Sequence, residues 1–256
     1  CCAKVPNVKL NDLLDEFIGK HIEKFKSRYD FEERKDRLGR DGDESIDIDL
    51  LQFKNAAKAL LLDRKINSKN ILLALYGAYT LCLGQNLERK NVFFHHIHNA
   101  ERLDDYLIDF PCSKIICMTR DPRANFFSGI EHWRKYNPNS DHGGHLFLYI
   151  KRILLDAYVL EKYSNDYVVM RIEDLGKKKV IDKLCTWLGI SYEDQLTKST
   201  WAGLTWRGDR LSAKENDTGG WSAKMLNNSW EKNMSATDKH LLNFLMNYLR
   251  RLLNED

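Results

Sequence analysis

Apolar residues recur at helical spacing through the first third of the chain. Between residues 11 and 29 they return every three or four positions behind an Asn–Asp start, as in an amphipathic helix. Two further stretches, about 46–64 and 68–83, repeat the pattern, and the second ends at Gly84. The charged segment 31–45 contains two glycines and is expected to form a mobile loop. The pattern therefore predicts a wholly helical segment over residues 1–85.

Beyond residue 90 the pattern changes to short apolar runs separated by helical stretches. Asn91–Ile97, Lys114–Thr119 and Tyr167–Ile172 are predicted strands. The last two are apolar almost throughout, as in parallel strands that are covered on both faces. Helices are predicted at about 100–109, 121–135, 144–164, 177–188 and 236–253. Strands that alternate with helices indicate a layered α/β domain with right-handed crossovers.

Length and charge narrow the classes of protein that fit. The 256 residues, 43% of them apolar, suit one large α/β domain or one domain with an insertion. Forty Lys and Arg oppose 37 Asp and Glu, so the net charge of +3 excludes a general nucleic-acid binder, and any anion site must be local. The six cysteines form no CxxC pair and show no metal-ligand spacing. With no signal peptide and no apolar stretch long enough for a membrane helix, we expect a cytoplasmic protein without membrane contact.

The most informative segment follows the second predicted strand. This strand ends at Thr119 and delivers Arg120 at its carboxyl end, where open α/β sheets bind ligands. Asp121 and Pro122 suit the cap and first turn of a helix. Ser128 lies eight residues after Arg120, about two helical turns on. A guanidinium and a hydroxyl at such a junction favour a phosphate site, whereas Arg-Asp-Pro alone would equally fit a capped helix with an outward Arg.

This strand-Arg-Asp-Pro-x₅-Ser pattern resembles the 3′-phosphate motif of the sulfotransferases that use 3′-phosphoadenosine 5′-phosphosulfate (PAPS). The resemblance covers roughly residues 91–256. It implies a three-layer α/β/α fold with a central parallel sheet, of the P-loop nucleotide-kinase type, within one domain over residues 1–256. Residues 91–256 would be the PAPS-binding core, and residues 1–85 a helical lid or acceptor-side insertion. It also implies that Arg120 and Ser128 hold the 3′-phosphate, and that adenosine 3′,5′-bisphosphate (PAP) is the product.

Three histidines lie at the end of the first predicted strand. On a strand, His96 and His98 would share one face while His95 points the other way. His98 lies 22 residues before Arg120, which resembles the interval from the catalytic His to the phosphate Arg in cytosolic sulfotransferases. Imidazole titrates near neutral pH, so it suits a base that takes the acceptor proton. His98 is the predicted base and His96 the reserve, although Ile97 stands where the family has Thr, and the family's Lys is missing.

Two other roles for these histidines stay open. His96 and His98 could ligate a metal, but no carboxylate or Cys lies nearby at ligand spacing, so no metal is predicted. They could also be ordinary core or hydrogen-bonding residues.

A basic segment late in the chain resembles the loop that sulfotransferases fold over the nucleotide. Arg207, Arg210 and Lys214 would neutralise phosphates, and Trp206 or Trp221 would cover the adenine. An ordinary solvated surface loop is an equally good interpretation. Tyr167–Leu175 matches a family strand that ends in Glu-Asp-Leu, which makes Glu173 and Asp174 capping or positioning groups.

One expected feature is missing from the sequence. Sulfotransferases hold the 5′-phosphosulfate in a Gly/Ser/Thr loop after the first strand, and no glycine before residue 91 follows an apolar strand. Either this loop precedes Cys1, which we favour because the later motifs are intact, or it has been lost and the protein binds nucleotide without catalysis. The sequence thus predicts sulfuryl transfer from PAPS to a hydroxyl or amine, most simply of a small molecule. Its rivals are a non-catalytic nucleotide-binding or interaction protein and a nucleoside or sugar kinase; the oligomeric state stays open.

Overall fold

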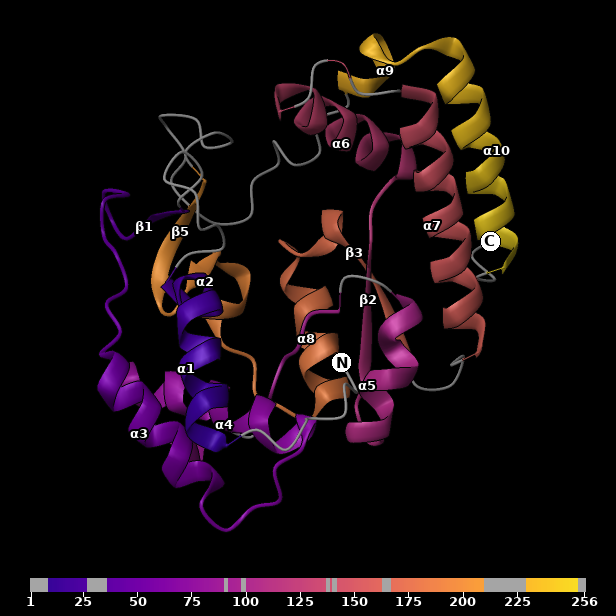
Figure 1. Cartoon of the computed structure of the whole chain (residues 1–256). Coiled ribbons are helices and arrows are strands. Elements are labelled where there is room, and N and C mark those ends of the chain that lie inside the picture. The colour runs from indigo at the N-terminus through magenta and orange to yellow at the C-terminus, as the bar shows by residue number, and fades with distance from the viewer. Residues whose placement is uncertain are drawn as a thin grey trace. The chain divides into compact units, whose positions relative to one another are not determined.

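The computed structural model describes residues 9–26, 36–89, 92–97, 100–136, 139, 142–162, 167–209 and 229–252. The described chain is mixed α/β and mainly helical (Figure 1). It divides into two compact units. Unit 1 comprises Cys1–His96, Asp105–Pro111 and Glu193–Gly220, and unit 2 comprises Ile97–Asp104, Cys112–Tyr192 and Trp221–Asp256. Among the described helices, none has the length and apolar character needed to cross a membrane.

The helices of unit 1 follow the predicted pattern closely. The first four are α1 (Leu10–His21), α2 (Glu23–Lys26), α3 (Leu50–Leu61) and α4 (Ser68–Cys82). Side-chain caps explain where the longer pair begins, because the Asp49 carboxylate accepts from the Gln52 N–H and the Asn67 side chain from the Asn70 N–H. Figure 1 shows α3 and α4 side by side, and Phe53 of α3 is completely buried in their shared core.

Unit 1 also contains a small antiparallel sheet that the sequence did not predict. Its strands are β1 (Asp36–Leu38), β5 (Leu204–Asp209) and β4 (Thr200–Trp201), in the order β1-β5-β4. The prediction that residues 1–85 are wholly helical was therefore wrong. A loop was predicted over residues 204–214, and its described part, Leu204–Asp209, is the strand β5 instead. A three-residue strand is too short to show a period of two, and its partner lies more than 160 residues away in the sequence.

Two positive-φ turns shape this sheet. Ala202 and Gly203 join β4 to β5, both with left-handed φ (49° and 89°), as in the tight turns that connect antiparallel strands. Gly39, with φ 81°, follows β1, and a Cβ there would overlap the Glu44 side chain. Glycine at position 39 therefore allows the chain to double back, so that the Glu44 N–H donates to the Leu38 carbonyl.

The predicted strand Asn91–Ile97 is not observed in the part of it that the structure describes. Its described part, residues 92–97, is irregular and is ordered by aromatic contacts instead of strand pairing. Phe93 lies 5.0 Å from Tyr76 of α4 between ring centroids, and His95 stacks on Tyr106 at 5.2 Å. A short run of aromatic and β-branched residues led to the strand prediction, whereas rings of this segment pack on rings of neighbouring helices. Tyr106 belongs to α5 (Leu103–Asp109).

Unit 2 contains two of the three strands that the sequence predicted, and they form a two-stranded sheet. β2 (Ile115–Thr119) and β3 (Tyr167–Arg171) are parallel, with Ile115 opposite Tyr167 and Thr119 opposite Arg171. The helices α6 (Pro122–Tyr136) and α7 (His142–Lys162) lie between them in the chain. A third helix, α8 (Lys178–Leu188), packs Ile181 and Cys185 on the strand face that carries Ile116 and Met170. Mixed α/β architecture with a parallel strand pair is thus confirmed.

A second core in unit 2 lies between helices. Figure 1 shows α10 (Ala236–Leu252) running beside α7, with α6 and α9 (Ser229–Asn233) near its start. Phe126 of α6, Leu146 of α7 and Leu242 of α10 are buried together there. Short 3₁₀ turns complete the described elements: η2 (Leu87–Arg89), η3 (Ala100–Arg102), η4 (Ile172–Asp174) and η5 (Asp194–Thr197). Because α6 is packed in this core, its direction relative to the end of β2 is fixed.

Candidate functional site

The candidate site begins where β2 passes into α6. Arg120 follows the last residue of β2 and is half-buried, and Pro122 is the buried first residue of α6. Asp121 between them caps the helix, because its Oδ1 accepts from the Arg123 N–H at 2.9 Å. Proline tolerates this position since its missing N–H would have no helical partner. The predicted helix start at Asp121-Pro122 is confirmed.

Asp121 also holds the Arg123 side chain in a two-pronged ion pair. Arg123 Nε donates to Oδ1 at 3.0 Å and Nη2 to Oδ2 at 2.6 Å. Burial raises the pKa of Asp121, but the hydrogen bonds and charge of Arg123 outweigh it, so the pKa lies below its ordinary value. Arg123 Nη1 further donates to Asn243 Oδ1 of α10 at 2.9 Å, and its guanidinium lies over the Trp230 ring. This arginine therefore anchors the start of α6 to α9 and α10.

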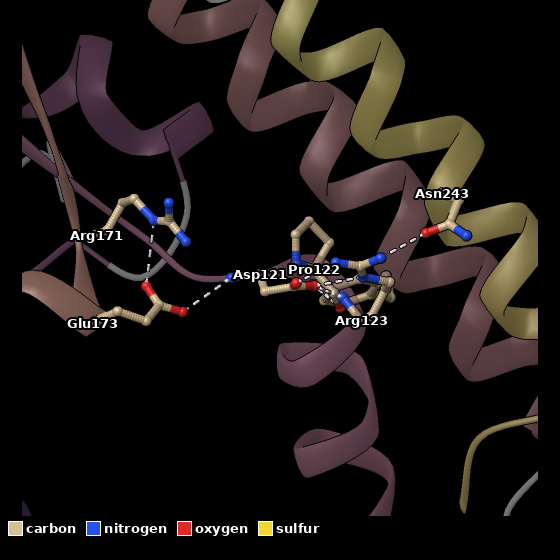
Figure 2. A network of polar contacts seen from close by, with 7 residues as sticks. Asp121, Pro122, Arg123, Arg171, Glu173 and Asn243 are labelled. Carbon is tan, nitrogen blue, oxygen red and sulfur yellow. Dashed lines mark hydrogen bonds and ion pairs between the residues drawn. The ribbon is translucent and has the colours of Figure 1, made fainter. Parts of the chain in front are cut away.

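Glu173 connects this junction to the end of β3. Its Oε1 accepts from the Asp121 N–H at 3.4 Å, and its Oε2 lies 3.6 Å from Nε of Arg171, the last residue of β3. Figure 2 shows the carboxylate between these two groups, with Arg123 and Asn243 on the other side of Asp121. The carboxyl ends of both parallel strands are thus tied together by one side chain. The predicted positioning role of Glu173 agrees with this geometry.

Arg120 has an aromatic neighbour on α7. The Tyr149 hydroxyl donates to the Pro122 carbonyl at 3.0 Å. Burial raises the pKa of Tyr149 and a hydrogen bond with Asn125 lowers it, while the charge of Asp121 raises it and that of Arg120 lowers it. Tyr149 fixes the first turn of α6 from the side and shapes the place where Arg120 leaves the sheet.

Ser128 lies on the exposed side of α6. It shares that side with Asn125 and Gly129, as residues three and four positions apart do on a helix. Its Cα is about 9 Å along the helix axis from that of Pro122, at 1.5 Å per residue. Arg120 and Ser128 therefore belong to the same unit, with one at the start of α6 and the other on its second turn. The hydroxyl is accessible to a ligand.

The predicted catalytic histidines lie in or next to the segment that is not a strand. His96 is exposed at the end of unit 1, and His98 lies outside the described residues. The argument that strand alternation puts both on one face therefore does not apply, because residues 92–97 are irregular. Burial, followed by the charge of His96, lowers the pKa of His95, whose ring stacks on Tyr106. Within the described ranges, no group of three or more His, Cys, Asp and Glu residues could hold a metal ion.

The predicted nucleotide-covering residues divide between strand and undescribed chain. Arg207 lies on β5, where Nε donates to the Gly39 carbonyl at 3.1 Å and Nη2 donates to the Arg40 carbonyl. Trp206 is half-buried against the unit 1 core. Arg210, Lys214 and Trp221 lie outside the described residues. Arg207 and Trp206 therefore belong to unit 1, where Arg207 holds the turn after β1, while Arg120 and Ser128 belong to unit 2.

Sequence reasoning missed two residues of this site. Arg123 stands two residues after the capping Asp121, a short spacing that allows one arginine to take both carboxylate oxygens, but no repeat or motif marks it. Arg171 was treated only as part of the strand that matches the family. Its position could have identified it, because it is the last residue of a strand that is parallel to the strand preceding Arg120.

No protein-family model matches the chain, and neither a curated protein nor a solved structure matches it. The functional argument therefore rests on the residues and their geometry.

Proposed function

We propose that the protein is a PAPS-dependent sulfotransferase whose donor site is built around Arg120. The observation that carries the proposal is the position of this guanidinium. It leaves the carboxyl end of a parallel strand at the capped start of α6, with the accessible Ser128 hydroxyl on the next turn. Open α/β sheets bind ligands at this edge. A guanidinium and a hydroxyl are donors that suit a phosphate monoester.

The residues at the junction fit a phosphate that is bound by side chains. Asp121 occupies the first free N–H groups of α6, since it accepts from the backbone of Arg123 and of Ala124. A phosphate would therefore depend on Arg120 and Ser128 and not on the helix terminus. Because Arg123 neutralises Asp121, the capping carboxylate adds little repulsion toward an anion held nearby.

We also propose that β2 and β3 are the visible part of a three-layer α/β/α, P-loop-like sheet. On one face, α8 packs against Ile116 and Met170. The opposite face carries Cys117, whose pKa is raised to about 11 by burial and then by the nearby charge of Asp156 on α7. A helix near each face is the arrangement expected in a layered α/β fold.

In the proposed reaction, Arg120 and Ser128 hold the 3′-phosphate and His98 accepts the proton of the acceptor. PAPS would supply an activated sulfuryl group. The acceptor oxygen or nitrogen forms the new bond to sulfur as the bond between sulfur and the phosphate oxygen breaks, and PAP leaves with that electron pair. The acceptor's proton goes to the His98 imidazole. Transfer of labelled sulfate from PAPS to an acceptor, lost on removal of Arg120, is the direct test.

Replacing Arg120 should weaken the binding of nucleotides that carry a 3′-phosphate. Arg120→Ala is expected to cost about 1.5–3 kcal/mol in affinity for PAP and much less for adenosine 5′-phosphate, because a charge-assisted contact to the 3′-phosphate is lost. Isothermal titration calorimetry measures both constants. Equal losses for the two nucleotides would contradict the assignment. A larger thermal shift with ATP–magnesium than with PAP would favour the kinase hypothesis, and binding of PAP without sulfate transfer would favour the non-catalytic one.

The segment 207–214 should respond to the nucleotide if it folds over the donor. Saturating PAP is then expected to slow limited proteolysis at this segment, since loops of this kind order on binding. Mass spectrometry of the fragments locates the cuts. If cleavage is equally fast with and without PAP, Arg210 and Lys214 do not cover the nucleotide and belong to an ordinary solvated segment. Arg207 then keeps its hydrogen bonds to the Gly39 and Arg40 carbonyls.

A further inference from the structure

Two arginines face each other across neighbouring strands of the unit 1 sheet. Between two regular pairs of the β1–β5 register, β1 contributes Arg37 alone and β5 contributes Arg207 and Gly208. One residue opposite two is the pattern of a β-bulge, which redirects side chains and is common next to functional sites. Like charges directly opposite on two strands destabilise a sheet. This arrangement of Arg37 and Arg207 is therefore unfavourable unless another charge offsets it.

Both side chains lie against one glycine of the turn that follows β1. Gly42 has a left-handed φ of 81°. A Cβ at this position would stand 3.1 Å from Arg37 Nε, 3.2 Å from Arg37 Nη2 and 3.4 Å from Arg207 Cδ. The Arg37 guanidinium and the aliphatic part of Arg207 therefore lie side by side on the same turn. The missing side chain at Gly42 leaves the space that the Arg37 guanidinium occupies.

The two arginines differ in what holds them. Arg207 donates from Nε to the Gly39 carbonyl at 3.1 Å and from Nη2 to the Arg40 carbonyl, which fixes its guanidinium on the turn. Arg37 is half-buried, and among the described residues it forms no hydrogen bond and no ion pair. Partial burial of a guanidinium without a partner costs free energy, and its planar fork carries five N–H donors. Arg37 therefore has donors for a ligand.

The carboxylates of the same turn do not pair with Arg37. Asp41, Asp43 and Glu44 are exposed, and Glu44 Oε1 accepts from the Arg40 N–H at 2.8 Å. Within the described ranges, no carboxylate lies at ion-pair distance from Arg37. The negative charges of these residues weaken long-range attraction of an anion to the turn. A ligand of Arg37 must therefore accept direct hydrogen bonds from the guanidinium, as an oxyanion does.

We propose that Arg37 and Arg207 form an oxyanion-binding site in unit 1, which takes a phosphate or sulfate group. Arg37 donates hydrogen bonds from its fork, and Arg207, held by the turn, supplies a fixed positive charge beside it. A free inorganic ion and the phosphate of a nucleotide offer the same oxygens. This site belongs to unit 1, whereas Arg120 belongs to unit 2. The inference therefore goes beyond the proposed donor site and does not depend on it.

The test follows the two guanidinium groups directly. The full chain, with isotope-labelled arginine, is titrated with sodium sulfate at constant ionic strength, and nuclear magnetic resonance follows the Nε–H signals, each assigned by an Arg→Lys substitution. The signals of Arg37 and Arg207 should move together with a single dissociation constant. Arg64, which is exposed just after α3 in the same unit, reports the general effect of salt. If Arg37 responds no more than Arg64, the proposal is wrong.

Substitution of Arg37 should weaken the site that Arg207 reports. Arg37→Gln should raise the dissociation constant for sulfate, measured at the Arg207 signal, about tenfold, because a charge-assisted contact is lost. Arg37→Lys keeps the charge without the planar fork and should raise it about threefold. Arg64→Gln is the matched control, since it removes one positive charge from the same unit, and should change the constant by less than about twofold.

Thermal stability separates anion binding from packing. Without an anion, Arg37→Gln should not lower Tm, because the substitution removes one of two like charges on facing strands. Saturating sulfate should then raise Tm more in the wild type than in Arg37→Gln, since only the wild type keeps the complete site. The general stabilising effect of sulfate acts on both proteins alike. If Arg37→Gln lowers Tm without an anion and leaves the sulfate constant unchanged, Arg37 is a packing residue and the proposal fails.

Titration with PAP identifies the source of the oxyanion and separates this inference from the proposed function. If Arg37→Gln weakens both sulfate and PAP, the site holds a phosphate of the nucleotide, and if it weakens sulfate alone, the site is separate from the nucleotide. Both results support the inference. If the wild type binds sulfate at Arg37 but does not bind PAP, the inference holds and the sulfotransferase proposal fails. If PAP binding depends on Arg120 and the Arg37 signal does not respond to either ligand, the proposed function stands and this inference fails.

Discussion

His98→Asn is expected to lower kcat for sulfate transfer by roughly 10²–10⁴-fold while leaving the affinity for PAP nearly unchanged. A base acts on the acceptor's proton and touches no phosphate, so its loss slows the chemical step without weakening the donor. Steady-state rates with labelled PAPS measure the loss of kcat, and isothermal titration calorimetry measures the affinity for PAP.

His96→Asn is the matched control for this substitution. It changes the same residue type two positions earlier, on an exposed side chain, and should be much milder. If His96 proves essential and His98 dispensable, the base must be moved by two residues. If kcat is unchanged in both variants, neither histidine is the base and the acceptor loses its proton by another route. If either variant loses a bound metal that the wild type holds, the histidines are metal ligands.

The parts of the fold that the sequence predicted are those whose signal is local. β2 and β3 were identified because each is a continuous apolar run bounded by polar residues, and the pattern also located α3, α4, α6, α7, α8 and α10. The cap at Asp121 could be predicted for the same reason, since an Asp before Pro places an acceptor and a fixed φ at a helix start.

The parts that escaped prediction depend on distant partners. β1 forms because Leu38 pairs with Trp206, and the segment around Arg207 is a strand for the same reason. Nothing in Asp36–Leu38 alone indicates this pairing. The error at residues 92–97 has another cause, because a run such as Val92-Phe93-Phe94 fits a pleated strand and an aromatic cluster equally well. Only the positions of Tyr76 and Tyr106 distinguish them.

The candidate site divides in the same way. Arg120 and Ser128 were predicted from a spacing within one strand–helix unit, and Arg120 immediately precedes the start of α6 while Ser128 lies on its second turn. The link from Asp121 through Glu173 to Arg171 crosses between strands more than 50 residues apart in sequence, and it becomes visible only when their register is known. The site is therefore more extensive than its motif.

Asp121→Ala should destabilise unit 2 by about 2–4 kcal/mol. The substitution removes the cap of α6, worth about 1 kcal/mol, and leaves the half-buried Arg123 guanidinium without its two-pronged partner. Asp121→Asn should cost less, because an amide oxygen can still accept from the Arg123 N–H. Urea unfolding followed by circular dichroism gives these free energies. Asp104→Ala is the matched control in the same unit: it breaks an exposed 2.9 Å pair with Lys162 and should cost less than about 1 kcal/mol.

The pH dependence of this loss identifies its electrostatic part. Folding lowers the pKa of Asp121, so its ionised form stabilises the folded state. That contribution is present in full above the unfolded-state pKa of about 3.9 and disappears as the pH falls through the lower folded-state pKa. The stability difference between wild type and Asp121→Ala should therefore be constant from about pH 7 to pH 5 and shrink below about pH 4. A difference that persists unchanged at about pH 2 would mean that packing, and not the ion pair with Arg123, holds this junction together.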